Sequence, residues 1–295
     1  SYVDVSRMKP LHLVVDAGNG CAGPVFRKLA EHLPFQFTEL YMEPDGTFPN
    51  GVPNPMLEEC RRPLIEAGKR TGADMGIAWD GDFDRCFFVD ETGNFVEGYY
   101  MVGLLASYFL HLHPGETIVH DPRCFWNTEA IVAEHHGKAV ESKGGHAFMK
   151  ETLRRVHGIY GAEMSAHHFF RDFSYCDSGM IPWLIVAQIL SETGKSLSEL
   201  VREREAAFPC SGEINLPAGD VQAVLAAVEQ AYGAEAQSVS HLDGVSLDFG
   251  SWRFNLRPSN TEPLIRFNME TRGDRALLEN KKAEVIRFIE QANRP

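Results

Sequence analysis

Short apolar runs alternate with helix-like segments through the first two thirds of this 295-residue chain, and this alternation constrains the fold more than any other feature. Runs such as Leu11–Asp16, Ala73–Trp79 and Thr117–His120 have the length and composition of buried strands. The segments Leu57–Lys69 and Tyr99–His111 predict helices between them. Strands that alternate with helices favour parallel sheets with crossover helices. The sequence therefore predicts an α/β architecture for this part.

The pattern changes after Pro209, where five strand-like runs follow with one helix among them and one after them. Such an order is typical of an α+β domain. We expect two consecutive α/β domains with mixed, largely parallel sheets at 1–110 and 111–208, followed by a smaller α+β domain at 209–295. The stretches LVVDAGNG and IVHDPRC echo each other faintly, but they are too short to establish a repeat.

The composition of the chain excludes several classes of binding partner. The net charge is −13, which argues against nucleic acid. The sequence holds no apolar run of about 18 residues, so no membrane span is expected. The six cysteines form no C-x-x-C pair, which argues against a zinc site and against a disulfide framework and favours a reducing, cytoplasmic location. A small anionic substrate would need a local pocket of arginines and backbone amides to overcome the overall negative field.

The segment DGDFDR places Asp80, Asp82 and Asp84 at alternate positions after an apolar run, with Arg85 directly behind them. In a regular strand, residues i and i+4 lie roughly 13 Å apart, too far for one small ion. A bend permitted by Gly81 would let the carboxylates converge. Three converged carboxylates suit Mg²⁺ with an open coordination face, and Arg85 could hold a phosphate oxygen beside it. The alternative is a solvated acidic turn.

The segment RPSNTEP combines a fixed charge with short hydrogen-bond donors. Arg257 supplies the charge, and Ser259, Asn260 and Thr261 supply hydroxyl, amide and backbone groups. Such a loop can cradle a phosphate. Arg266, on the following strand, could reach the same place. A plain hairpin turn would explain the Pro, Ser and Asn equally well.

The segment GAEMSAHHFFRD contains Glu163 and Ser165, which could bind sugar hydroxyls, and His167 beside them. Taken alone this is weak, because a Glu and a His in a loop are more often surface residues. We expect Phe169 and Phe170 to belong to the core.

Two further stretches carry basic groups near expected element ends. Lys143 and His146 flank a Gly pair that opens a helix, a position that favours anions, and His146 titrates near neutral pH as a general acid or base must. An exposed His at a helix start is the competing interpretation. Arg123 follows a predicted strand, where open α/β sheets place ligand groups.

Together these segments resemble the α-D-phosphohexomutases. DGDFDR resembles the family's metal loop, GAEMSAHH its sugar-recognition loop, KGGHAF a segment before a helix, and RPSNTEP its phosphate loop, all in the family's order. The stretches PDGTFPNGVPNP and YCDSGMIPW look most like those of bacterial phosphomannomutases of the exopolysaccharide pathway.

The resemblance implies a function. Members interconvert sugar 1-phosphates and 6-phosphates through a hexose 1,6-bisphosphate, with an active-site phosphoserine and Mg²⁺. It implies that the three aspartates hold the metal and that Arg85 neighbours the transferring phosphate. Glu163 and Ser165 would hold sugar hydroxyls, and the RPSNTEP loop would hold the distal phosphate. His146 would be an acid/base candidate and Arg123 a phosphate contact.

The sequence also departs from the family. Ala166 stands where many members have Gly, and Gly144 where Thr is usual. The 295 residues contain no T-A-S-H-N-P-like phosphoserine loop, which the family carries in its first domain. We therefore expect domains two to four, with the N-terminal domain as implied partner, poor metal binding and little activity alone. The alternatives are a phosphoglucomutase, a phosphoglucosamine mutase, or a sugar-phosphate-binding protein without catalysis.

Overall fold

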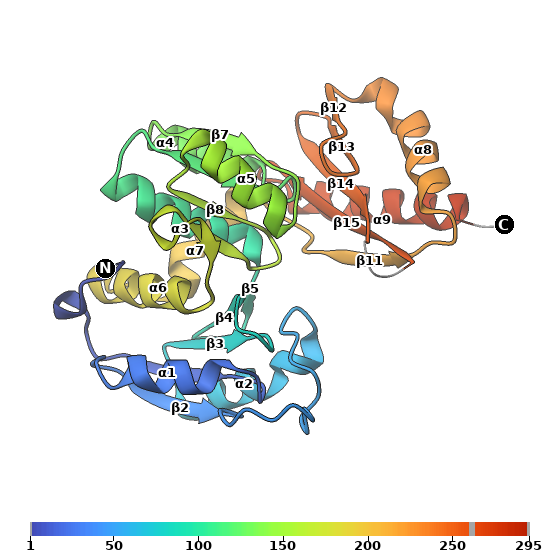
Figure 1. Ribbon diagram of the computed structural model, residues 1–295. Helices are drawn as coiled ribbons and strands as arrows, with labels where there is room; N and C mark the ends of the chain where they lie inside the picture. The colour runs from blue at the N-terminus through green and yellow to red at the C-terminus, as the bar shows by residue number, and fades with distance from the viewer. Residues whose placement is uncertain (1, 260–262, 294–295) are drawn as a thin grey trace.

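The computed structural model describes residues 2–259 and 263–293, which build three five-stranded sheets, each with its own helices (Figure 1). The first two sheets are mixed and the third is antiparallel, which confirms the predicted fold class. Within these residues, no helix combines the length and the apolar character that crossing a bilayer requires.

The first sheet has the strand order β2-β1-β3-β4-β5, with β2, β1 and β3 parallel and the other two antiparallel. Alternate residues of its central strand face opposite cores: Leu13 and Val15 pack with Phe26 on one side, and Val14 packs with Leu64 on the other. The elements of this region are η1 (Val5–Arg7), β1 (His12–Asp16), α1 (Ala22–Ala30), β2 (Gln36–Leu40), α2 (Glu58–Thr71), β3 (Met75–Trp79), β4 (Cys86–Asp90) and β5 (Phe95–Val96).

The second sheet repeats this topology, with the order β7-β6-β8-β9-β10 and the same change from parallel to antiparallel pairing. The faint sequence echo therefore marks two equivalent central strands, β1 and β6. The elements are α3 (Gly98–Leu112), β6 (Thr117–His120), α4 (Trp126–Glu134), β7 (Lys138–Glu141), α5 (His146–Val156), β8 (Tyr160–Ala162), β9 (His168–Phe170), η2 (Arg171–Phe173), β10 (Cys176–Asp177), α6 (Met180–Thr193) and α7 (Leu197–Ala207).

The third sheet has the order β11-β15-β14-β13-β12 and carries α8 and α9 on one face. Its two faces differ in character: Phe254, Leu256 and Phe267 pack against the helices, whereas Arg253 and Glu270 lie on the opposite face. The elements are β11 (Ile214–Pro217), α8 (Val221–Tyr232), η3 (Gly233–Glu235), β12 (Ser238–Ser240), β13 (Val245–Asp248), β14 (Trp252–Pro258), β15 (Leu264–Thr271) and α9 (Arg275–Ala292).

The longer strands and helices lie where the periodicity predicts them, and Phe169 and Phe170 are fully buried as expected. Three short strands, β5, β9 and β10, were not predicted. A strand of two or three residues leaves too little alternation to recognise. Two of these strands place site residues, because His167 directly precedes β9 and Asp177 ends β10.

Candidate functional site

The DGDFDR segment forms the tight connection between β3 and β4. Asp80, Asp82 and Asp84 each offer a carboxylate oxygen within 4.8 Å of the others, so the predicted convergence is confirmed. The left-handed residue of the loop is Phe83, with φ of 54°, and its N–H donates to the Asp80 carbonyl at 3.1 Å. The prediction that Gly81 supplies the bend is wrong, since its φ lies outside the positive range.

The DGDFDR loop holds three carboxylates that repel one another and one positively charged side chain, that of Arg85. Arg85 Nε lies 2.6 Å from Asp80 Oδ2, and the Arg85 backbone N–H donates to Asp80 Oδ1 at 3.2 Å. Burial raises the pKa of Asp84 to about 6, and the charges of Asp80 and Asp82 add to this effect against the opposing influence of His167. Asp82 is exposed. This donor set could hold a hard divalent cation such as Mg²⁺, because it offers only carboxylate oxygens and keeps one side open for water or phosphate.

The backbone ties the metal loop directly to the GAEMSAHH segment of the second domain. Arg85 and His167 form an isolated antiparallel bridge, and the Cys86 N–H donates to the Ala166 carbonyl at 3.3 Å. Ala166 lies in the left-handed region with φ of 71°. Glycine adopts that conformation without strain, which gives a physical reason for glycine as the usual residue there.

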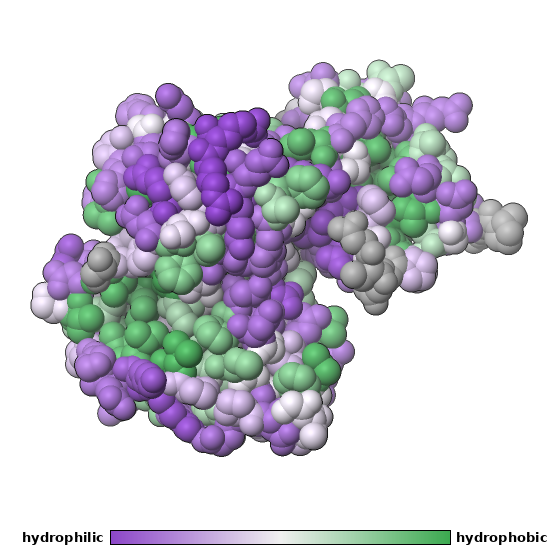
Figure 2. All heavy atoms as spheres, viewed as in Figure 1, coloured by the Kyte–Doolittle hydropathy of each residue, from purple (hydrophilic) through white to green (hydrophobic). Residues whose placement is uncertain are grey.

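A cavity of about 490 Å³ lies between the three domains, and residues from all three line it. Figure 2 shows the molecule hollowed between the first and the C-terminal domain. The predicted site residues on its wall are Arg85, Glu163, Ser165, His167, Arg257 and Arg266. The fold thus brings together side chains that lie far apart in the sequence.

Glu163 is buried at the centre of this wall. Its Oε1 accepts the Gly145 N–H at 3.1 Å, and its Oε2 accepts the Ser165 hydroxyl at 3.4 Å. Arg123 lies 3.6 Å from the same Oε2. These three contacts hold the carboxylate in one orientation. A carboxylate that binds hydroxyl groups needs such a fixed orientation.

Arg257 and Arg266 are cross-strand neighbours on β14 and β15, and both point to the polar face of the third sheet. Glu213 lies between them: its Oε2 is 3.7 Å from Arg257 and its Oε1 is 3.4 Å from Arg266. Asp243 lies 3.7 Å from Arg257 on the other side. Burial lowers the pKa of Arg257 from its ordinary value, and the neighbouring Arg123 adds to this effect.

Other predicted residues do not line this cavity. Arg123 is buried behind its wall, in ion pairs with Asp121 and, at 2.8 Å, with the lining residue Glu213. Lys143 lines a neighbouring cavity of about 380 Å³, which Arg257 also borders. The Ser259 N–H donates to the Leu264 carbonyl at 2.9 Å. Asn260 and Thr261 lie outside the described residues.

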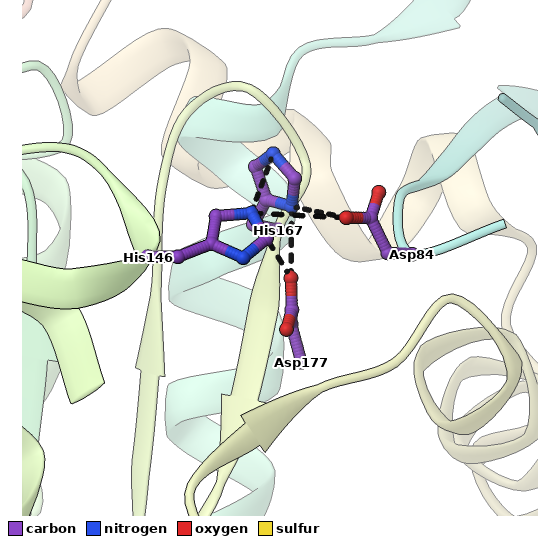
Figure 3. Close-up of side chains that lie close together, drawn as sticks. All are labelled: Asp84, His146, His167 and Asp177. Carbon is purple, nitrogen blue, oxygen red and sulfur yellow. Dashed lines mark hydrogen bonds and ion pairs between the residues drawn. The ribbon is translucent and has the colours of Figure 1, made fainter. Parts of the chain in front are cut away.

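The two histidines meet at the junction of the first and second domains. His146 Nε2 lies 3.4 Å from His167 Nε2, and His167 Nδ1 lies 3.1 Å from Asp177 Oδ2 (Figure 3). Burial and the neighbouring His167 lower the pKa of His146. Burial alone would raise the pKa of Asp177, but the hydrogen bond from His167 and the charge of His146 lower this pKa to about 2.

Sequence reasoning missed Glu213 and Asp177. Each meets partners that are distant in the chain, and neither belongs to a charged motif of its own. The sequence signal around Asp177 is the stretch YCDSGM, which resembles the family but assigns no role to the aspartate. Glu213 directly precedes β11 in the linker to the third domain, and nothing in its local sequence distinguishes it from a surface acid.

Comparison with known proteins identifies the family. Models of phosphoglucomutase/phosphomannomutase α/β/α domain II, α/β/α domain III and the C-terminal domain match residues 1–93, 97–208 and 213–288. The chain belongs to the phosphoglucomutase/phosphomannomutase, or phosphohexomutase, family.

Two curated relatives illustrate the similarity. The chain is 57% identical over 289 residues to a protein of Xanthomonas campestris pv. campestris named "Phosphohexose mutases", with 98% of this chain and 64% of the relative covered. It is 55% identical to a Salmonella montevideo phosphomannomutase, with 98% and 64% covered. The chain thus spans about 64% of the length of these relatives.

Solved structures share the fold. A phosphoglucomutase/phosphomannomutase family protein from Burkholderia thailandensis aligns with a TM-score of 0.85 at 30% identity, covering 98% of this chain and 62% of that one. An Aspergillus fumigatus N-acetylphosphoglucosamine mutase in complex with GlcNAc-6P and magnesium aligns with a TM-score of 0.67 at 15% identity, covering 97% and 62%. The second likeness concerns the fold alone.

Proposed function

We propose that this chain is the part of a phosphomannomutase that binds the sugar phosphate, and that the whole protein interconverts mannose 6-phosphate and mannose 1-phosphate through a bisphosphate. The product would feed GDP-mannose and surface polysaccharide synthesis in the cytoplasm. The observation that carries this proposal is the cavity of about 490 Å³ between the domains. It brings the metal loop, the sugar-recognition loop and the paired arginines of the third sheet to one place.

Different groups around the cavity would bind different parts of the substrate. Glu163 and Ser165 offer hydrogen bonds to the sugar hydroxyls from one wall. Arg257 and Arg266 face them and would hold the phosphate that does not react, with Ser259, Asn260 and Thr261 nearby in sequence. Charged guanidinium groups bind phosphate with paired, directional hydrogen bonds. This arrangement would orient either end of a hexose phosphate toward the metal loop.

The reacting end lies at the junction of the first and second domains. Asp80, Asp82 and Asp84 would hold Mg²⁺, which supplies charge stabilisation to a transferring phosphoryl group when it is bound. Arg85 releases Asp80 and turns to the phosphate. His146 and His167 lie within reach of each other and can take or return the proton of the sugar hydroxyl.

We propose that residues 1–295 alone bind sugar phosphate but do not catalyse its isomerisation. In the mechanism that the family resemblance implies, a phosphoserine donates and regains the phosphoryl group, and it also completes the metal site. None of the segments that line the cavity carries the expected phosphoserine motif, so binding and chemistry should be separable in this chain.

Calorimetric titration with mannose 1-phosphate tests the binding step. We expect Arg257→Ala to weaken binding roughly tenfold to a hundredfold, because a hydrogen bond to a charged group contributes about 1.5–3 kcal/mol. Arg27→Ala is the matched control: this exposed arginine pairs with Glu39 and Glu43 far from the cavity and should leave binding unchanged. Equal affinity of the Arg257→Ala variant and the unmodified chain would contradict the proposed phosphate site.

Turnover is tested by phosphorus NMR, with mannose, glucose and glucosamine 1-phosphates, Mg²⁺ and a hexose 1,6-bisphosphate. We expect no conversion by residues 1–295 and preferential conversion of mannose 1-phosphate by the full-length protein. Preference of the full-length protein for glucose or glucosamine phosphate would replace the proposed substrate. Binding without turnover in the full-length protein would favour a non-catalytic sugar-phosphate-binding protein.

A further inference from the structure

Four side chains with metal-binding atoms converge beside the metal loop. Asp84 comes from that loop, His146 begins α5, His167 directly precedes β9, and Asp177 ends β10 (Figure 3). Each offers one ligand atom, and these four atoms all lie within 4.8 Å of one another. All four residues are half-buried, so the cluster is neither a solvated surface group nor a sealed core.

The separations match one tetrahedral ion. His146 Nε2 lies 3.3 Å from Asp177 Oδ2 and 3.7 Å from Asp84 Oδ2. His167 Nδ1 lies 3.1 Å from Asp177 Oδ2 and 3.7 Å from Asp84 Oδ2. Zinc binds histidine nitrogen and carboxylate oxygen at about 2.0–2.1 Å, which places neighbouring tetrahedral ligands roughly 3.3 Å apart. The four separations depart from that value by a few tenths of an ångström, and the two remaining pairs of ligand atoms lie within 4.8 Å of each other.

We propose that Asp84, His146, His167 and Asp177 form a second metal site, which takes one transition-metal ion such as Zn²⁺. Two imidazoles and two carboxylates suit zinc, whereas Mg²⁺ prefers oxygen ligands alone. The site is distinct from the three-aspartate group in its chemistry, although the two share Asp84.

Neighbouring groups already hold the ligands in position. Lys150 Nζ lies 3.1 Å from Asp177 Oδ1, which leaves Oδ2 directed at the two histidines. The ring of Phe169 packs against both imidazoles, with centroid distances of 5.6 Å to His146 and 6.2 Å to His167. Such supporting contacts fix the orientation of ligand side chains and raise the affinity of a metal site.

Occupation of this site has a consequence that depends on the proposed function. An ion there would withdraw Asp84 from the three-aspartate group and would occupy the ring nitrogens with which His146 and His167 exchange protons. A transition metal would therefore inhibit the mutase even when Mg²⁺ is abundant. The binding itself does not depend on that function, since it requires only the four side chains.

Cobalt(II) absorption spectroscopy on the 295-residue chain tests the site, because tetrahedral cobalt absorbs much more strongly than six-coordinate cobalt. We expect one equivalent of Co²⁺ to give the strong tetrahedral spectrum, and one equivalent of Zn²⁺ to abolish it. His146→Asn and Asp177→Asn should each weaken zinc binding, measured by competition, by about a hundredfold. Lys150→Met, which removes a supporting contact, should weaken it by about tenfold.

Asp82→Asn is the matched control, because Asp82 belongs only to the three-aspartate group. This variant should keep the tetrahedral spectrum and the zinc affinity. A six-coordinate cobalt spectrum of the unmodified chain would overturn the proposal. So would loss of the tetrahedral spectrum in Asp82→Asn, or unchanged zinc affinity in His146→Asn. Thermal unfolding of every variant identifies a loss of fold. Failure of the mannose 1-phosphate titration would leave these metal measurements unaffected, so the two proposals can fail separately.

Discussion

The two junctions between the three domains differ in chemistry. The first and second domains share one apolar core, in which Trp183 of α6 packs against Phe26, Phe37 and Trp79 of the first domain with ring centroids 5.9 to 6.5 Å apart. The third domain has a separate apolar core of its own. It meets the second domain through the polar face of its sheet.

Buried polar contacts dominate that second junction. Glu270 on β15 accepts hydrogen bonds from the Tyr99 hydroxyl and, at 3.0 Å, from the Trp126 N–H of the second domain. Arg253 lies 3.0 Å from Glu270 and donates to the Pro122 carbonyl at 2.6 Å. The stabilisation of an apolar junction grows with the apolar area that it buries and tolerates small displacements. Buried charges, in contrast, are stable only while their partners stay in place. The first two domains should therefore behave as one unit, and the third should separate when a single partner is removed.

Truncation of the apolar junction should have the largest effect. Trp183 is fully buried, so Trp183→Ala should lower the free energy of unfolding by about 4 to 5 kcal/mol through the cavity that it leaves. Urea denaturation monitored by tryptophan fluorescence and circular dichroism measures this loss. Trp183→Phe is the control: it keeps an aromatic ring and should cost less than half as much. Equal losses in the two variants would mean that ring volume does not hold this junction together.

Removal of Glu270 should loosen the polar junction at a cost of about 3 to 4 kcal/mol, because buried Arg253 would lose its nearer carboxylate and keep only Glu141, 3.6 Å away. We expect the third domain to unfold in a separate, earlier thermal transition and the linker at 208–213 to become sensitive to protease. Tyr99→Phe removes one hydrogen bond to the same carboxylate and should cost about 1 kcal/mol. A single cooperative transition in Glu270→Ala would show that the domains do not separate at this junction.

The pH dependence should distinguish two carboxylates near the ends of equivalent strands, Asp16 as the last residue of β1 and Asp121 directly after β6. Burial raises the pKa of Asp16 to about 6, so its contribution to stability is complete below its unfolded pKa near 4 and is lost as pH rises through 6. A shift of about two units corresponds to roughly 2 to 3 kcal/mol. Relative to the unmodified chain, Asp16→Asn should therefore gain stability as pH rises from 4 to 6, because the variant lacks this loss.

Asp121 should behave in the opposite way. Burial alone would raise the pKa of Asp121, but the charge and the hydrogen bond of Arg123 outweigh burial and lower this pKa below its ordinary value. Its contribution is present above the unfolded pKa near 4 and is lost as pH falls toward the folded value. The difference in stability between Asp16→Asn and the unmodified chain should become constant below pH 4, where Asp16 is protonated in both the folded and the unfolded state, and both profiles should fall there as the Asp121 contribution is lost. A stability difference between Asp16→Asn and the unmodified chain that stays constant between pH 4 and 6 would contradict the assignment to Asp16.

The sequence predicted most of the architecture because the long strands and helices carry strong periodicity. It also predicted the convergence of Asp80, Asp82 and Asp84, since carboxylates that alternate at the end of an apolar run repel one another unless a cation balances them. It could not locate the bend at Phe83, because a left-handed aromatic residue is rare and leaves no signal in composition. Polar and apolar residues alternate along β14 and β15, but the sequence does not show which domain covers the polar face.

The contacts between distant segments were beyond prediction. Glu213 meets Arg123, Arg257 and Arg266, which come from two domains, and only the three-dimensional fold defines that group. Gly144, which stands where Thr is usual in the family, is a similar case. A Cβ at this position would lie 3.1 Å from Asp243 Oδ2, so the space around it depends on the third domain.

Glu213 would give the proposed phosphate binding the character of ion exchange. Arg257 and Arg266 already have a carboxylate neighbour, so an arriving phosphate would replace one anion with another instead of neutralising bare cations. The displaced carboxylate keeps Arg123 at 2.8 Å and is never left without a counter-ion. Capture should therefore depend only weakly on ionic strength, and a chain with a net charge of −13 can still accept a doubly charged sugar phosphate.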